Sequence, residues 1–217
     1  MKQAVERKKA AARIILVVTC VLIAEWIFPP LFGHRSWAFR ILIAAILIFG
    51  FFTHRALKET PRNLGLRMDN FFRSMLLLGP PMFFSVLLLV LLGYRLGTLG
   101  LPASVAWRHI GNYLWLLWWG LLQEYALQAI INRQAQILWG KGPRSVLFVG
   151  LIFAALHLPN PALTIATFAG GLIFAYIYQR VPNLFALALS HSVMTMALTW
   201  TLPPSLLHSL RVGAAYR

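Results

Sequence analysis

Apolar residues gather in seven long runs along this chain, and polar stretches separate the runs. The runs cover residues 14–32, 37–53, 71–92, 111–131, 145–158, 162–178 and 184–201. A membrane-spanning helix needs about 20 mainly apolar residues, and the run at 145–158 is short for this purpose. The pattern predicts an all-α fold, a polytopic transmembrane bundle of about seven or eight membrane helices.

The prolines and the polar stretches suggest how the chain is divided. We expect about three membrane helices and a linker in residues 1–104, a core that carries the polar site in residues 105–201, and a tail in residues 202–217. Pro80 and Pro81 should kink or break the third run, because proline removes a helical hydrogen bond.

The composition agrees with an integral membrane protein that has no separate soluble domain. Hydrophobic residues make up 59% of the 217 positions and charged residues 12%, whereas soluble domains average roughly 45–50% apolar residues. The single cysteine, Cys20, excludes an intrachain disulfide.

The net charge of +15 raises the possibility of nucleic-acid binding, but the basic residues stand at the ends of the apolar runs. That placement is typical of anchors for anionic lipid headgroups and speaks against a nucleic-acid partner. Fourteen of the 20 Lys and Arg residues fall on the side of the bundle that holds the N-terminus. The positive-inside rule therefore predicts a cytoplasmic N-terminus, and we expect a bacterial inner-membrane location.

Three ionisable side chains interrupt the apolar runs: Glu124, His157 and His191. A charge at bilayer depth costs roughly 2.5–3.5 kcal/mol on insertion scales. With a helical rise of 1.5 Å per residue, Glu124 and His191 lie roughly 12 Å deep and His157 roughly 20 Å deep. Taken singly, each could be a structural contact between helices or at a helix end. Together, at similar depth, they suggest one shared polar cavity.

These residue types could activate water. A carboxylate can take a proton from water, and imidazoles can steer the water or stabilise an oxyanion. Gln128 follows Glu124 by four residues and shares its helix face; Thr195 follows His191 at the same spacing and could orient the imidazole. The same Glu and two His could alternatively hold a divalent metal, although the HExxH motif is absent. Glu25 is expected to reach the external interface.

The sequence from Phe153 to His157 reads Phe-x-x-x-His and continues as Leu-Pro-Asn-Pro. The stretch from 168 to 191 adds Gly170-Gly171, Arg180 and Asn183 ahead of His191. In these residues the chain resembles the CPBP family of intramembrane proteases, the Abi-type group with CAAX-processing and bacteriocin-processing members. The resemblance covers about residues 105–200, with a weaker echo at 63–67.

The resemblance implies a catalytic set and a supporting set. The catalytic residues would be Glu124, His157 and His191, and the supporting residues Gln123, Gln128, Phe153 and Thr195. The first family motif is degenerate: the family pattern Glu-Glu-x-x-x-Arg reads Gln123-Glu124 with Gln128 here, and Thr195 stands where the family has Asn or Asp. An amide cannot accept a proton from water at neutral pH, so a role for Glu124 as base requires it to face the cavity.

The resemblance implies an intramembrane endopeptidase that activates water with a Glu and two His. Its substrate would be a peptide or a lipidated protein that enters through the membrane, and no cofactor would be required. An alternative is an inactive pseudoprotease that binds a membrane-embedded or lipidated partner. A proton-coupled transporter is a third possibility, because intramembrane Glu and His also build proton relays.

Overall fold

The structure, a computed structural model, describes residues 2–32, 37–99 and 110–216. It is 85% helical, and no strand occurs in these ranges. The helices are α1 (Lys2–Trp26), α2 (Phe28–Phe32), α3 (Trp37–Ala56), α4 (Pro61–Leu64), α5 (Phe71–Arg95), α6 (Ile110–Glu124), the π-helix η1 (Tyr125–Asn132), α7 (Arg133–Trp139), α8 (Pro143–Ala155), α9 (Pro161–Arg180), α10 (Leu184–Thr201), α11 (Pro204–Leu207) and the 3₁₀ turns η2 (His208–Leu210) and η3 (Gly213–Tyr216). The expected boundary at residues 104 and 105 lies outside the described residues.

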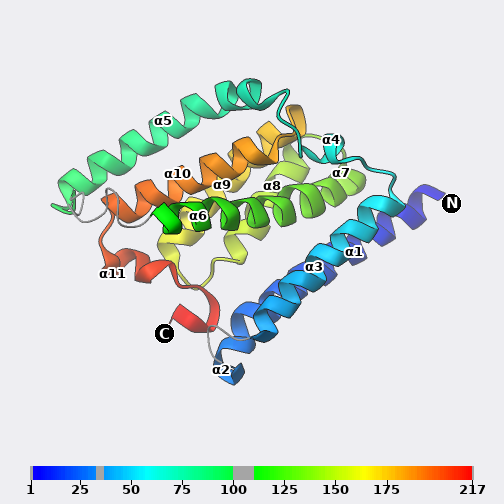
Figure 1. Cartoon of the computed structure of the whole chain (residues 1–217), viewed down its shortest axis with the longest axis horizontal. Helices are drawn as coiled ribbons and strands as arrows, with labels where there is room; N and C mark the ends of the chain where they lie inside the picture. Colours follow the sequence, from blue (N-terminus) through cyan, green and yellow to red (C-terminus); the bar gives the residue numbers. More distant parts are fainter. Residues whose placement is uncertain (1, 33–36, 100–109, 217) are drawn as a thin grey trace.

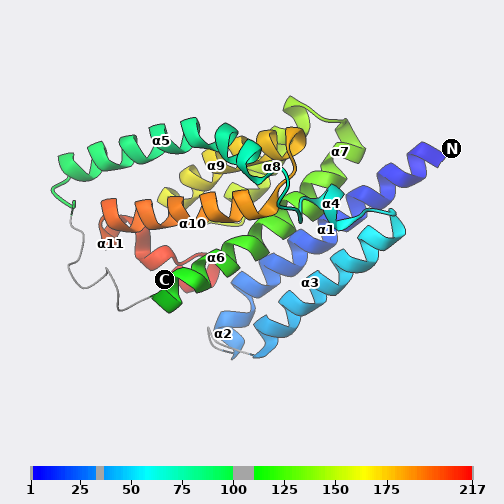
Figure 2. The same ribbon diagram turned by 45° about the horizontal axis from the view of Figure 1, so that its top comes forward.

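The helices form one bundle in which α6, η1 and α7 follow one another as a long central rod (Figures 1 and 2). Helix α10 packs between α6 and α5, and α8 packs along α9. Helices α1 and α3 run side by side on the opposite side of the rod from α5. The chain ends at η3, which returns to α1 and α2.

Three helices of the described ranges, α5, α9 and α10, are long and apolar enough to cross a membrane, and α8 is a shorter apolar helix. The prediction of an all-helical membrane protein is confirmed, whereas the number of seven or eight spans stays a prediction. Of the expected kink or break at Pro80 and Pro81, the break does not occur, because helix α5 runs unbroken through both prolines.

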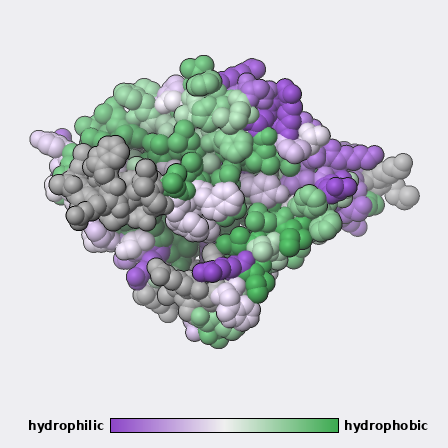
Figure 3. Space-filling model, in the orientation of Figure 1, coloured by the Kyte–Doolittle hydropathy of each residue, from purple (hydrophilic) through white to green (hydrophobic). Residues whose placement is uncertain are grey.

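Hydropathy separates the two ends of the molecule. Hydrophilic residues gather around α4, α7 and the start of α1, while apolar side chains cover α5 (Figure 3). Leu76 and Phe72 of α5 are 77% and 80% exposed. Since these side chains have few protein neighbours, α5 presents its apolar surface to lipid.

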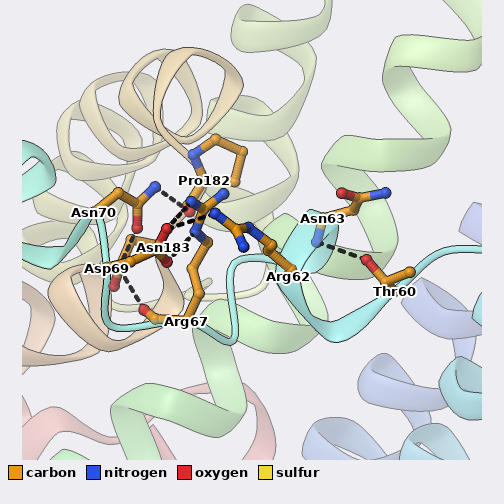
Figure 4. Close-up of polar contacts among 8 residues, drawn as sticks. All are labelled: Thr60, Arg62, Asn63, Arg67, Asp69, Asn70, Pro182 and Asn183. Carbon is orange, nitrogen blue, oxygen red and sulfur yellow. Dashed lines mark hydrogen bonds and ion pairs between the residues drawn. The ribbon is translucent and has the colours of Figure 1, made fainter.

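A polar clamp fixes the start of α10 (Figure 4). Asn183 caps the helix by accepting a hydrogen bond from the amide of Ala186 at 2.8 Å. Its side-chain amide donates to the carbonyl of Arg67 and to Oδ1 of Asn70, both at 2.7 Å. Asn70 in turn donates to the carbonyl of Pro182 at 3.1 Å. The loop before α5 is thereby attached to the turn that precedes the helix of His191.

Gly65 allows the same loop to approach the turn closely. Its φ is +89°, and a Cβ atom built there would lie 2.9 Å from the backbone nitrogen of Asn183. The carbonyl of Gly65 accepts a hydrogen bond from the amide of Leu184 at 2.9 Å. The segment at 63–67 that echoes the family pattern therefore has a structural role.

A second close approach joins α8 to α9. A Cβ atom at Gly171 would lie 3.0 Å from Cα of Gly150. Contacts between small residues let helices approach this closely in a membrane. The approach places the end of α8, and with it His157, against the rest of the core.

Candidate active site

The central carboxylate comes from the last residue of α6. Glu124 is completely buried, and the π-helix η1 begins at the next residue. Its Oε1 lies 2.9 Å from Nδ1 of His191 on α10. Because a carboxylate only accepts hydrogen bonds, Nδ1 carries the hydrogen of the neutral imidazole, and Nε2 keeps a lone pair. The contact joins two residues that lie 67 positions apart in the sequence.

The second imidazole is held by its own helix. His157 lies two residues beyond the end of α8, and its Nδ1 donates to the carbonyl of Phe153 at 2.8 Å. The same tautomer argument leaves Nε2 of His157 as an acceptor. The ring of Phe153 meets both imidazoles, with ring centroids 4.8 Å from His157 and 5.9 Å from His191. The ring of Phe153 therefore packs against both histidines.

Both histidines line one cavity with a volume of about 330 Å³. Its walls come from α1, α3, α6, η1, α8, α9, α10 and the C-terminal tail, and most of the lining side chains are apolar. The acidic, amide, imidazole and hydroxyl side chains on the wall are Glu25, Gln123, His157, Thr167, His191 and Thr195. An apolar cavity with a few converging polar groups is the usual form of a small-ligand or active site.

A column of buried amides supports Glu124 from the side of η1. Nε2 of Gln128 donates to Oε2 of Glu124 at 3.2 Å, and Nδ2 of Asn132 donates to Oε1 of Gln128 at 2.8 Å. Nε2 of Gln179 on α9 then donates to Oδ1 of Asn132 at 2.9 Å. These three amides are at most 6% exposed. The amide column, Gln128, Asn132 and Gln179, fixes the carboxylate of Glu124 by hydrogen bonds and places no second charge beside it.

The expected side-chain pairs are found in part. Gln128 contacts Glu124 as its spacing indicated. The hydroxyl of Thr195 instead donates to the backbone carbonyl of His191 at 3.0 Å, and the carboxylate of Glu124 orients the imidazole. The prediction for Thr195 was wrong because a threonine hydroxyl in a helix readily bonds the carbonyl one turn before it.

The two neighbours at 123 and 124 point in different directions. Gln123 lines the cavity, whereas Glu124 is not among the wall residues and reaches the cavity through His191. Adjacent residues on a helix differ by about 100° in direction, and here only Gln123 of this pair lies on the wall. Within the described residues, no three His, Cys, Asp or Glu side chains come together as metal ligands.

Sequence reasoning missed Asn132, Gln179 and Glu25. The spacing of four residues from Glu124 through Gln128 to Asn132 was a usable signal, because it places the three side chains along one face. Glu25 was expected at the interface, but it lines the cavity, and its Oε2 is buried. That position depends on packing between α1 and the C-terminal tail, which no local pattern reports.

A family model matches more than half of the chain. Residues 81–197 match the model described as type II CAAX prenyl endopeptidase Rce1-like, and this range contains Glu124, His157 and His191. No significant match was found among curated proteins or among solved structures. The matched range covers more than half of the 217 residues. The apolar helical bundle agrees with this match. The chain therefore belongs to the type II CAAX prenyl endopeptidase Rce1-like family, which is a family of proteases.

Proposed function

We propose that this protein is an intramembrane endopeptidase of the CAAX-protease type, which hydrolyses a lipidated peptide. The observation that carries the proposal is the contact between Glu124 and Nδ1 of His191 beside a cavity that His157 also lines. A carboxylate, an imidazole and a free Nε2 at a cavity wall are the elements of a general base for water.

The geometry supports an indirect role for Glu124. A water molecule in the cavity would donate one hydrogen to Nε2 of His191 and the other to Nε2 of His157. Its oxygen then attacks the scissile carbonyl carbon, the proton passes to His191, and the electrons of the carbonyl double bond move to its oxygen. Glu124 stabilises the imidazolium that forms. The side-chain amide of Gln123 on the cavity wall can donate to the oxyanion.

The apolar part of the cavity suggests where a lipid group would lie. Val17 and Val21 of α1 and Ile43, Ile46 and Leu47 of α3 line it. Apolar surface gains roughly 25 cal/mol for each Å² removed from water, so such a wall suits a prenyl chain. The scissile bond would then lie at the polar wall of α8 and α10.

Glu124→Gln tests the proposal. Gln has nearly the same shape, but it removes the charge that stabilises the imidazolium. Turnover of a prenylated peptide by the purified protein should fall about 10²–10⁴-fold, the usual size of general base catalysis. Glu6→Gln is the matched control, because Glu6 lies on the surface of α1 and pairs only with Lys9 among the described contacts. Equal turnover by Glu124→Gln and wild type would refute the role of the pair.

A pseudoprotease is the second candidate, and one observation favours it. The cavity wall holds the amide of Gln123 where the family pattern has a carboxylate. In that case the wild type captures a prenylated peptide without cleaving it, and Gln123→Glu combined with Gln128→Arg restores turnover. Detectable hydrolysis by the unmodified protein excludes this function.

A further inference from the structure

Glu25 places a carboxyl group on the wall of the cavity itself, whereas Glu124 reaches this cavity only through His191. It comes from the last turn of α1, whereas Glu124 comes from α6. Glu25 lines the same cavity as His157 and His191. Its Oε2 is buried and has no hydrogen-bond partner in the structure. A buried polar oxygen without a partner is costly, so a proton, water or a bound ligand is needed to satisfy it.

The C-terminal tail holds Glu25 beside the segment that follows His157. A Cβ atom at Gly213 would clash with the backbone oxygen of Glu25, so the two backbones are in direct contact. The amide of Gly213 donates to the carbonyl of Leu158 at 2.8 Å. Gly213 thus bridges the end of α1 to the residue after His157. The φ of +58° at Gly213 makes glycine suited to this position.

The two carboxyl groups have different surroundings. Glu124 accepts hydrogen bonds from His191 and Gln128. The cavity around Glu25 is mostly apolar, with Val21 and Ala24 from its own helix among the lining residues. Two carboxyl groups in contrasting environments are a recurrent basis for dividing the roles of base and acid in one site.

Amide hydrolysis needs such an acid. When the tetrahedral intermediate collapses, the C–N bond breaks, and the leaving nitrogen must receive a proton. We propose that Glu25 is the general acid of this site and donates that proton. The inference rests on the proposed peptidase function.

The proton balance is complete without a further reactant. Water gives one proton to His191 as its oxygen bonds to the carbonyl carbon. The protonated Glu25 gives its proton to the leaving nitrogen while the C–N electron pair moves to that nitrogen and the carbonyl reforms. Transfer of a proton from the His191 imidazolium to Glu25, through water, restores both groups. The net reaction consumes one water and one peptide bond.

The test compares an amide with a phenyl ester at the same position of one prenylated peptide. Phenolate has a conjugate acid with a pKa of about 10 and leaves without prior protonation, whereas an amine does not. Glu25→Gln should lower amide turnover by about 10²–10⁴-fold and leave ester turnover near that of wild type. Glu25→Asp keeps a carboxyl group and should recover part of the amide turnover. Glu6→Gln, on the same helix, should change neither rate.

The possible outcomes separate this inference from the proposed function. If Glu25→Gln cleaves the amide as fast as the wild type does, Glu25 is not the general acid, and the proposed peptidase function still stands. If Glu25→Gln loses amide and ester turnover equally, the role of Glu25 as general acid is also refuted. Ester turnover reports whether the site and its base are intact, so its loss would mean that the substitution damages the site as a whole. A wild type that cleaves neither substrate refutes both proposals. Selective loss of amide cleavage, with recovery by Glu25→Asp, supports the assignment.

Discussion

Replacing Asn132 by Leu probes the amide column that supports Glu124. Asn132 is completely buried and takes part in four hydrogen bonds. It donates to Gln128 and to the carbonyl of Ala175, and it accepts from Gln136 and Gln179. Leu has the same number of side-chain heavy atoms with the same branching, so the substitution removes hydrogen bonds and opens no cavity.

The expected loss of stability follows from these contacts. Hydrogen bonds between membrane helices contribute about 0.6 kcal/mol each on average. The carbonyl of Gln128 loses its Asn132 donor at 2.8 Å, and a buried unsatisfied polar group costs about 1–3 kcal/mol. We therefore expect the free energy of unfolding to fall by roughly 3–5 kcal/mol. Turnover should fall as well, because Gln128 would no longer be held against Glu124.

The assay is unfolding in mixed detergent micelles, followed by the near-UV signal of the tryptophans, with peptide turnover measured in parallel. Gln136→Leu is the matched control, since Gln136 is only partly buried and donates one of these bonds, at 3.2 Å. It should cost less than about 1 kcal/mol. A loss below about 1 kcal/mol for Asn132→Leu, or equal losses for the two variants, would show that the column does not stabilise the site.

Two further predictions concern residues in loops between helices. Gly65→Ala should destabilise the protein by more than the roughly 1–2 kcal/mol that a left-handed backbone conformation costs a residue with a side chain, because the new Cβ would also meet the backbone of Asn183. The control is Gly97→Ala, at φ +65° with no atom within 4 Å of the new Cβ. In the same unfolding assay it should cost only the roughly 1–2 kcal/mol of the left-handed conformation. Burial by itself would raise the pKa of Glu59, but its basic partners, including Arg133 at 2.7 Å, outweigh burial and lower the pKa below its usual 4.5. The stabilisation by Glu59 is then present above pH 4.5 and is lost as the pH falls through the lower pKa of the folded state. Glu59→Gln should therefore be less stable than the wild type at neutral pH and equally stable in strong acid. A stability difference that persists in acid would show that the ion pair is not its cause.

The helices and the meeting of polar residues could be predicted from the chain because both depend on simple spacings. Runs of apolar residues set the helices, and the helical rise placed Glu124 and His191 at equal depth. The contact at 2.9 Å between their side chains agrees with that estimate. The pairing of Glu124 with Gln128 followed in the same way from a separation of four residues.

The direction of each side chain could not be predicted, because it depends on how a helix is rotated in the bundle. The sequence places Gln123 and Glu124 side by side and does not decide which of them faces the cavity. The π-helix after Glu124 also left no signal in the apolar periodicity. Such helices often occur at functional sites, and here the π-helix carries Gln128 and Asn132 of the amide column.

The position of Glu25 illustrates a second limit. Its place on the cavity wall depends on Gly213, which lies 188 residues later and contacts its backbone. Local hydropathy treats Glu25 as an isolated charge near a helix end. Only the packing of the tail against α1 brings this carboxyl group to the site of the two histidines.

The fate of water oxygen tests the central claim most directly. Wild-type protein in liposomes is given a prenylated peptide in water enriched in ¹⁸O, and the products are weighed by mass spectrometry. A peptidase that activates water beside His191 and Glu124 puts one ¹⁸O atom into the new carboxyl group of the prenylated fragment, and Glu124→Gln forms little of this product. Recovery of the bound, uncleaved peptide alone from the wild type would contradict the account.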